Sequence, residues 1–335
     1  MKTIKIVLML LFVLGMSPSR AAAEVDELNF ATLYGVSTLP VIVMQRNRLV
    51  EKHAAAAGIK DLKINWRVVG GSSLLNDGLI GGKLQFIGVG ITPLITLWDK
   101  TQGANQVKGV AAMTTYPLYL NVRNPQVRSI ADFSARDKIA LPSIKVSTQA
   151  IMLQMAAAKA FGPENYARLD PLTVSLSHPD GQTALVNRVN GVTAHFTVSP
   201  YHEQEIKLPD VRTLMTSYDI LGGPGTANLL VTTSKFREDN PKLYKAVYDA
   251  LREAIAFINE DKLRAAKIYL DFTKDTSMTA QAIDAMISAP DYFYEMTPRK
   301  VGETARFMQQ IGAIRHSPAS WQDLFFPEAH ALPGD

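Results

Sequence analysis

The stretch 70–93, GGSSLLNDGLIGGKLQFIGVGITP, decides the fold of this chain. It opens with two glycines and two serines, continues with apolar residues at helical spacing, and stops at Gly81-Gly82. An apolar run over 84–89 follows, and then Gly-Ile-Thr-Pro. We interpret the stretch as loop, helix, turn, strand and loop, with a further helix opening at its end. Two helix N-termini would then face one cleft, where they favour anionic or polar groups, and the glycines would permit close approach.

The residues before this stretch predict a parallel sheet. A strand is expected over 28–33, followed by a turn at Gly35 and a helix over about 40–57 that ends at Gly58. A second strand is expected over 63–69. Strand, helix, strand, helix and strand in this order are typical of a parallel sheet covered by helices.

A second unit of the same kind lies further along the chain. A helix is expected from His178 to about 189, then a turn, a strand over 192–198 and a loop over 199–202. This repeats the helix, turn and aromatic-bearing strand of 70–93, so we predict two similar α/β lobes; chance similarity of two such units is the alternative. Further strands are expected over 107–114, 118–123, 138–141, 173–176, 211–215 and 229–233, helices over 93–100, 149–161, 263–272, 280–287 and 298–311, and a loop over 218–225.

The C-terminal part is predicted to be mainly helical. Asn240 is the expected N-cap of a long helix with Pro241 at its first position. An apolar tail over 321–326 is expected to pack on the first lobe.

The first 23 residues are predicted to be a secretory signal peptide. Lys2 and Lys5 precede an apolar segment over 6–15, and Ala21-Ala22-Ala23 supplies small residues for cleavage after about Ala23. An uncleaved anchor is the alternative, but the apolar segment is shorter than the roughly 20 residues of a spanning helix. We therefore expect a soluble mature protein, exported to a periplasm.

Composition excludes several classes of function. The chain has no cysteine, which removes thiol catalysis, cysteine-based metal sites and a lipid-modified cysteine. The signal segment holds three of the 35 basic residues, which leaves 32 against 31 acidic residues, with no clustered basic face for a nucleic acid. No G-x-S-x-G, Walker or G-x-G-x-x-G motif lies in a suitable context, and the spacing of His195 and His202 matches no metal motif. We predict no enzymatic activity, no cofactor and no metal.

The order of these motifs resembles one known family. The segments 30–35, 70–73 and 82–88, with the second unit and the helical C-terminus, are similar to periplasmic substrate-binding proteins of nitrate-, sulfonate- and taurine-type ABC importers, related to the NMT1/THI5-like proteins. The resemblance implies a type II periplasmic-binding-protein fold, with two α/β lobes joined by a two-crossover hinge. It also implies a small solute held between the lobes and delivered to the membrane subunits of an ABC importer. Gln85 departs from the aspartate that is common in the family.

The resemblance also suggests how the chain is divided. Lobe 1 is expected to comprise 24–115 and 227–335, and lobe 2 to comprise 116–226. We expect a monomer. A ligand-sensing receptor domain for a membrane signalling partner is the alternative function, and an enzyme that makes the thiamine pyrimidine is a weaker one, because such an enzyme is cytosolic and uses a cysteine-rich motif.

Polar residues at strand ends and helix starts are the predicted ligand contacts. A hydroxyl there either caps its helix or contacts a ligand, and a tyrosine either stacks on a ligand or packs in the core. Lys145 beside a helix start would suit a sulfonate or carboxylate, whereas His178 is interpreted as a capping or loop residue. The ligand is a sulfonate, another small organic acid or oxyanion, or an aromatic or heterocyclic compound. The candidate residues are Tyr34, Ser37, Thr38, Ser72, Ser73, Thr92, Tyr116, Lys145, Ser147, Thr148, His195, Thr197 and Ser199.

Overall fold

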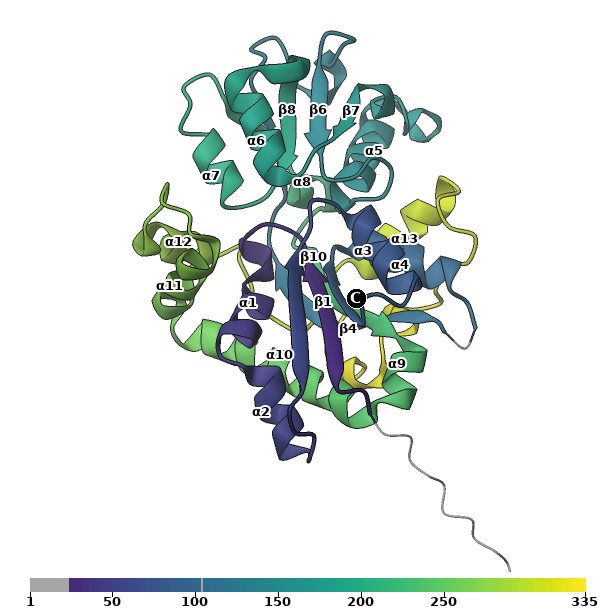
Figure 1. Ribbon diagram of the computed structural model, residues 1–335. Helices are drawn as coiled ribbons and strands as arrows, with labels where there is room; N and C mark the ends of the chain where they lie inside the picture. The colour runs from purple at the N-terminus through teal and green to yellow at the C-terminus, as the bar shows by residue number, and fades with distance from the viewer. Residues whose placement is uncertain (1–23, 104) are drawn as a thin grey trace, which may run out of the picture.

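The fold consists of two α/β lobes, each built on a five-stranded sheet (Figure 1). The computed structural model describes residues 24–103 and 105–335, so the predicted signal segment 1–23 lies outside the described residues. None of the helices in the described part is long and apolar enough to cross a membrane.

The sheet of lobe 1 has the strand order β2-β1-β3-β10-β4. The strands β1, β2 and β3 are parallel, as the sequence predicts, whereas β10 runs antiparallel to both β3 and β4. The antiparallel strand is the one by which the chain returns from lobe 2. The bounds are β1 Glu27–Thr32, β2 Lys63–Val68, β3 Phe86–Val89, β4 Val107–Thr115 and β10 Thr226–Thr233.

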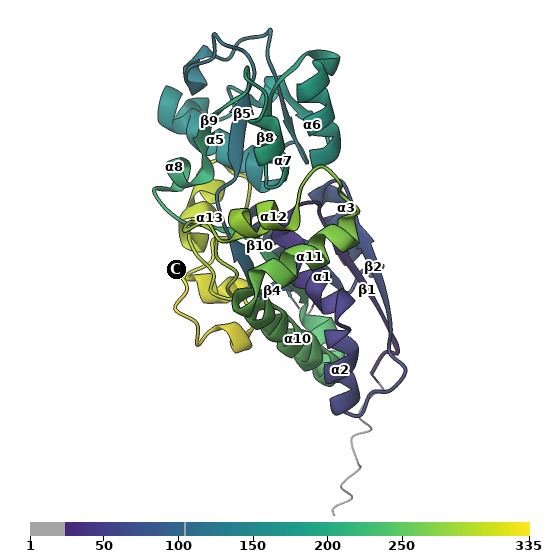
Figure 2. The same cartoon turned by 90° about the vertical axis from the view of Figure 1, so that its left-hand side faces the viewer.

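Helices cover both faces of this sheet. One face carries α1, α2, α10 and α11, which Figure 2 shows side by side, and α3, α4 and α13 lie on the other. Their bounds are α1 Leu39–Arg46, α2 Leu49–Ala56, α3 Ser72–Ile80, α4 Ile91–Lys100, α9 Ser234–Asp239, α10 Pro241–Glu260, α11 Lys262–Thr273, α12 Ala280–Ile287 and α13 Val301–Gln310. The single helix predicted over 40–57 is wrong, because Arg48 adopts a left-handed conformation (φ 53°) between α1 and α2.

The sheet of lobe 2 has the order β7-β6-β8-β5-β9. The strands β6, β7 and β8 are parallel, and β5 is antiparallel to β8 and β9. The bounds are β5 Tyr119–Val122, β6 Lys138–Leu141, β7 Thr173–Ser175, β8 Val192–Thr197, β9 Arg212–Thr216, α5 Thr148–Phe161, α6 His178–Asn187, α7 Tyr201–Glu205 and α8 Ser217–Leu221. The loop predicted over 218–225 is partly wrong, because a capping box of Thr216 and Asp219 starts the short helix α8.

The chain passes twice between the sheets. It crosses from β4 to β5 through Tyr116-Pro117-Leu118 and returns from α8 to β10 through residues 222–225. At the first crossing, the ring of Tyr116 stacks on that of Tyr292 with centroids 4.7 Å apart. The first crossing therefore lies against the C-terminal segment of lobe 1.

The apolar tail packs on lobe 1, which confirms the prediction. Phe325 forms a bridge with Gly109 of β4, and the indole of Trp98 donates to the carbonyl of Asp323 at 3.0 Å. A Cβ on Gly109 would lie 2.6 Å from the ring of Phe325, so glycine leaves room for this ring. Short 3-10 turns complete the structure: η1 Val36–Thr38, η2 Ile130–Asp132, η3 Pro163–Asn165, η4 Asp170–Leu172, η5 Val189–Gly191, η6 Trp321–Leu324 and η7 Pro327–Ala329.

Candidate functional site

The N-termini of four helices meet at one cavity between the lobes. Lobe 1 contributes the starts of α3 and α4, and lobe 2 contributes the starts of α5 and α6. Free backbone N–H groups and the positive end of the helix dipole lie at each start. The cavity is lined by Leu33, Tyr34, Ser37, Ser72, Gly90, Tyr116, Leu118, Thr148, Gln149, His178, Val198, Ala227 and Asn228.

The lobes are closed around this cavity. Its volume is about 30 Å³, which is enough for one or two water molecules. Backbone N–H of Val36 in lobe 1 donates to the carbonyl of Ser199 in lobe 2 at 3.1 Å, and Thr92 Oγ1 donates to the carbonyl of Val146 at 3.1 Å. The structure is therefore a closed form with direct contacts between the lobes.

Two glycines of the stretch 70–93 permit this close approach. A Cβ on Gly71 would lie 2.9 Å from the carbonyl oxygen of Pro142, and a Cβ on Gly90 would lie 2.1 Å from Thr148 Oγ1. Both neighbours belong to lobe 2. For Gly71 and Gly90, the predicted role in close approach is confirmed.

Two buried polar atoms at the cavity have no hydrogen-bond partner among the described residues. They are Thr148 Oγ1 and Asn228 Oδ1. The side chains of these residues are 6% and 5% exposed, so an unmade hydrogen bond there costs about 1–3 kcal/mol. Asn228 donates through Nδ2 to Ser37 Oγ at 3.0 Å, and either orientation of its amide leaves one end for the cavity.

No lysine or arginine is among the described residues that line the cavity. In the first turns of the four helices, the only acid is Asp180 of α6, which accepts a hydrogen bond from the capping Ser177 at 2.5 Å. Tyr116 is fully buried, and burial raises the pKa of its hydroxyl, although a hydrogen bond with Ser37 lowers it. The hydroxyl therefore stays protonated and can donate. The positive character of the cavity thus comes from backbone and hydroxyl donors.

Five of the predicted residues line the cavity: Tyr34, Ser37, Ser72, Tyr116 and Thr148. Ser72 and Ser73 are the first two residues of α3 rather than its cap, which is Gly71, and Ser73 points to solvent. Lys145 is exposed with φ 63° and does not line the cavity.

The remaining predicted residues make contacts within the protein. Thr38 donates to the carbonyl of Gly35, Ser147 caps α5, and Ser199 donates to Glu203. Thr92 contacts lobe 2, as described above, and Thr197 is fully buried on β8. His195 is also fully buried and lies behind the cavity wall. These residues shape the site without reaching the cavity.

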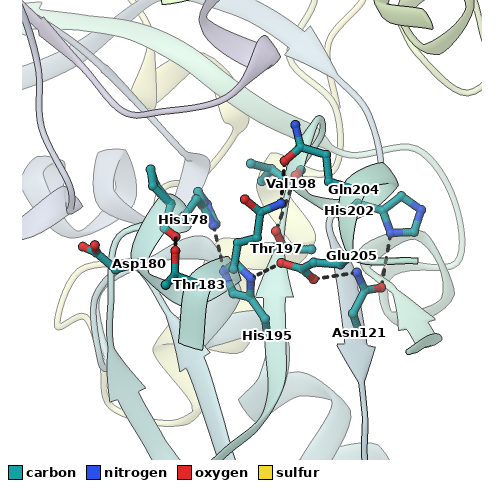
Figure 3. A network of polar contacts seen from close by, with 12 residues as sticks. Asn121, His178, Asp180, Thr183, His195, Thr197, Val198, His202, Gln204 and Glu205 are labelled. Atoms are coloured by element: carbon teal, nitrogen blue, oxygen red, sulfur yellow. Dashed lines mark hydrogen bonds and ion pairs between the residues drawn. The ribbon is translucent and has the colours of Figure 1, made fainter. Parts of the chain in front are cut away.

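A chain of polar side chains leads from the cavity into lobe 2 (Figure 3). Gln149 Nε2 lies 3.3 Å from His178 Nε2, and His178 Nδ1 lies 3.2 Å from His195 Nε2. His195 Nδ1 lies 2.6 Å from Glu205 Oε1. Glu205, which is fully buried, also accepts from Asn121 Nδ2 at 2.8 Å. The two cavity-lining members of this chain are Gln149 and His178.

A larger groove adjoins the cavity between the same lobes. Its volume is about 560 Å³, and Leu33 and Tyr34 line both spaces. Aromatic side chains of both lobes, Tyr34, Tyr201, Tyr269 and Phe272, form much of its wall. Gln204 of lobe 2 crosses it and donates to Ser277 Oγ at 2.8 Å and Asp275 Oδ2 at 3.2 Å. The described residues contain no group of three His, Cys, Asp or Glu side chains placed to hold a metal ion.

Comparison with known proteins identifies the family. Residues 21–270, most of the chain, match the model of the NMT1-like family. The chain belongs to the NMT1-like family. This confirms the resemblance found in the sequence. No curated protein matches the chain by sequence.

Solved structures share the fold of this NMT1-like chain. The alkanesulfonate-binding protein SsuA from Xanthomonas axonopodis pv. citri bound to MOPS has a TM-score of 0.69 at 17% identity, over 88% of this chain and 96% of that one. The periplasmic nitrate-binding protein NrtA from Synechocystis PCC 6803 has a TM-score of 0.68 at 15% identity, over 90% of this chain and 85% of that one. The periplasmic aliphatic sulphonate binding protein SsuA from Escherichia coli has a TM-score of 0.63 at 17% identity, over 90% of this chain and 99% of that one. The predicted type II periplasmic-binding-protein fold is confirmed.

Among the polar side chains that line the cavity of this NMT1-like chain, sequence reasoning missed three: Gln149, His178 and Asn228. His178 was interpreted as a cap, but Ser177 caps α6 and His178 is its first helical residue. Asn228 lies on the returning strand β10, where no motif marks it. The sequence offered one signal that could have found Gln149 and His178: each lies in the first turn of a predicted helix.

Proposed function

We propose that this protein is an exported solute-binding protein that captures a small acid or oxyanion and delivers it to the membrane subunits of an ABC importer. The observation that carries the proposal is the meeting of four helix N-termini, two from each lobe, at one cavity that no lysine or arginine of the described residues lines. Helix starts bind anions through free N–H groups and the helix dipole. The solved sulfonate- and nitrate-binding proteins of the same fold support this choice of ligand class.

The two unpartnered side-chain atoms fit such a ligand. Thr148 has a hydroxyl that can donate, and the amide of Asn228 can turn its N–H₂ toward the cavity while Ser37 donates to its oxygen. With the free N–H groups of the helix starts, these groups would surround an acidic head group with donors. A longer solute would place its head group in the cavity and its remainder in the adjoining aromatic-walled groove.

Ligand binding would stabilise the closed form. In the proposed division, lobe 1 comprises 24–115 and 227–335, lobe 2 comprises 116–226, and the two crossings form the hinge. The ligand contacts both lobes at once only in the closed form, so it shifts the population toward closure. The closed monomer in the periplasm is the form that we propose the importer recognises.

Thermal unfolding of the purified protein with candidate solutes tests this function. We expect nitrate, bicarbonate, methanesulfonate, taurine or an aromatic acid to stabilise the protein, by about 2.7 kcal/mol at a hundred times its dissociation constant. Neutral pyrimidines and methylammonium serve as controls without an acidic group. Stabilisation by the controls alone would reject the anion assignment. Turnover of a solute without any stabilisation would favour an enzyme instead.

A further inference from the structure

We propose that the side-chain amide of Gln149 donates a hydrogen bond to the bound acid, and that His178, His195 and Glu205 behind it fix the orientation of that amide. This inference rests on the proposed function, because it needs an acidic group in the cavity. It adds a specificity-determining contact and three positioning residues that the sequence did not reveal in these roles.

The geometry places one continuous chain of hydrogen bonds behind the cavity. His178 is on the cavity wall and 4% exposed, and His195 and Glu205 are fully buried (Figure 3). The three contacts from Gln149 through both histidines to Glu205 are 3.3, 3.2 and 2.6 Å long. Each neutral imidazole has one donor and one acceptor nitrogen. The direction of the hydrogen bond at the Glu205 end therefore fixes the direction of the hydrogen bond at the Gln149 end.

Charge balance selects the direction. Of the described residues, only His195 forms an ion pair with Glu205. A carboxylate buried without a counter-charge costs several kcal/mol. The chain from His178 to Glu205 is therefore expected to be neutral overall, with one acidic proton shared between His195 and Glu205.

Both neutral arrangements give the same result at the cavity. When His195 holds the proton, its Nδ1–H donates to the Glu205 carboxylate and its Nε2–H donates to His178 Nδ1. When Glu205 holds it, the carboxyl O–H donates to His195 Nδ1, and His195 Nε2–H again donates to His178 Nδ1. In both cases His178 accepts at Nδ1, so its own proton lies on Nε2, which faces Gln149 and the cavity.

The groups around His178 agree with a neutral donor there. Burial, and secondly the charge on His195, hold the pKa of His178 well below its usual 6.5. From α7, Tyr201 stacks on His178 with centroids 5.8 Å apart, and Glu205 lies beyond His195. On its own helix, Asp180 is turned to its cap Ser177. None of these groups accepts from His178 Nε2, so this N–H is left to donate to the amide of Gln149.

Gln149 is the member of this chain of hydrogen bonds that donates to the ligand. Its amide faces His178 Nε2 at 3.3 Å, and the oxygen and nitrogen of an amide exchange by rotation. With a proton on His178 Nε2, the amide turns its oxygen to the histidine and its N–H₂ to the cavity. This wall of the cavity then presents an N–H₂ group of fixed direction, which favours an acid and disfavours an ammonium group.

The packing of α6 leaves room for this chain of hydrogen bonds. A Cβ on Gly181 would lie 2.6 Å from His195 Nε2, so only glycine at this position lets the ring reach His178. Gly181 lies inside α6, where glycine costs about 1 kcal/mol relative to alanine. The helix thus carries a weak helix former where the imidazole ring of His195 needs space.

Nitrogen NMR of histidine-labelled free protein tests the direction without any ligand. The two ring nitrogens of a neutral histidine have distinct ¹⁵N shifts, so the protonated nitrogen of His178 can be read directly, with His178→Gln used for assignment. We expect His178 to be protonated on Nε2 at neutral pH. Protonation on Nδ1 would overturn the proposal. In Glu205→Met, which removes the acidic proton, we expect the two tautomers of His178 to mix; an unchanged Nε2 tautomer would overturn the positioning role of Glu205.

Calorimetry with methanesulfonate and nitrate tests the contact to the ligand. We expect Gln149→Leu, which removes the donor, to weaken binding at least tenfold, and His178→Phe, which removes the N–H that orients the amide, to weaken binding by a smaller factor. Equal binding by Gln149→Leu and the unsubstituted protein would reject the contact. If the unsubstituted protein binds neither probe, the proposed function fails and the contact fails with it, whereas the NMR result still decides the direction of the chain.

Discussion

At the scale of single residues, His202 shows how burial couples protonation to stability. Its ring stacks on Tyr119 at 3.6 Å between centroids, and its Nδ1 lies 3.2 Å from Asn121 Oδ1. Burial lowers the pKa of His202 from 6.5 to about 4. The unfolded chain therefore takes up a proton near pH 6.5 while the folded protein does not. The contribution of neutral His202 is complete above pH 6.5 and is lost as the pH falls toward 4.

We predict that the titration of His202 lowers the free energy of unfolding by about 2 kcal/mol between pH 7 and pH 5. Urea unfolding at both pH values measures the free energy of unfolding. The variant His202→Phe keeps an aromatic ring on Tyr119 but cannot titrate. In this variant the difference in the free energy of unfolding between pH 7 and pH 5 should be smaller by about the same amount. Glu203, whose pKa burial raises, acts in the opposite direction, so variant and parent are compared at each pH. An identical pH dependence in the two proteins would contradict the assignment.

At the scale of elements, the approach of α3 to lobe 2 depends on Gly71. A Cβ there would lie 2.9 Å from the backbone oxygen of Pro142, which cannot rotate away as a side chain can. We predict that Gly71→Ala leaves both lobes folded but hinders closure, and weakens methanesulfonate binding about tenfold, as overpacking by 1–2 kcal/mol would.

The matched control is Gly302→Ala on α13, where the same methyl group would meet only the end of Arg306 at 3.4 Å. Calorimetry measures the affinity, and small-angle scattering with methanesulfonate measures closure. The expected pattern is a loss in Gly71→Ala and parent-like behaviour in Gly302→Ala. Equal affinity in both would show that closure tolerates the methyl group.

Local patterns in the sequence predicted most of the elements but only part of the cavity. Helical spacing and glycine stops located α3, β3 and α12 closely, because these signals are local. The sequence indicated the starts of α3, α4 and α5 at the cleft, whereas the start of α6 was not selected, because His178 was interpreted as a capping or loop residue. Lys145 was selected as a cation beside a helix start, yet its left-handed backbone directs it to solvent. Which of these residues reach the cavity depends on the tertiary arrangement, and no local pattern in a single sequence predicts that arrangement.

At the scale of the whole molecule, the balance between open and closed forms depends on contacts outside the cavity as well as on the ligand. Gln204 of lobe 2 bonds to Ser277 and Asp275 in the loop between α11 and α12 of lobe 1. These bonds exist only while the lobes are together. Each hydrogen bond of this kind contributes about 0.5–1.5 kcal/mol to the state that contains it.

We predict that Gln204→Ala lowers the closed population and speeds release of methanesulfonate threefold to tenfold, with little change in thermal stability, because each lobe keeps its own core. Stopped-flow release and small-angle scattering measure the two effects. Gln182→Ala is the matched control: Gln182 donates to Gln204 Oε1 at 2.6 Å from the same groove wall, and both residues belong to lobe 2. Faster release in Gln182→Ala than in Gln204→Ala would place the control of opening within lobe 2 rather than at the contact between the lobes.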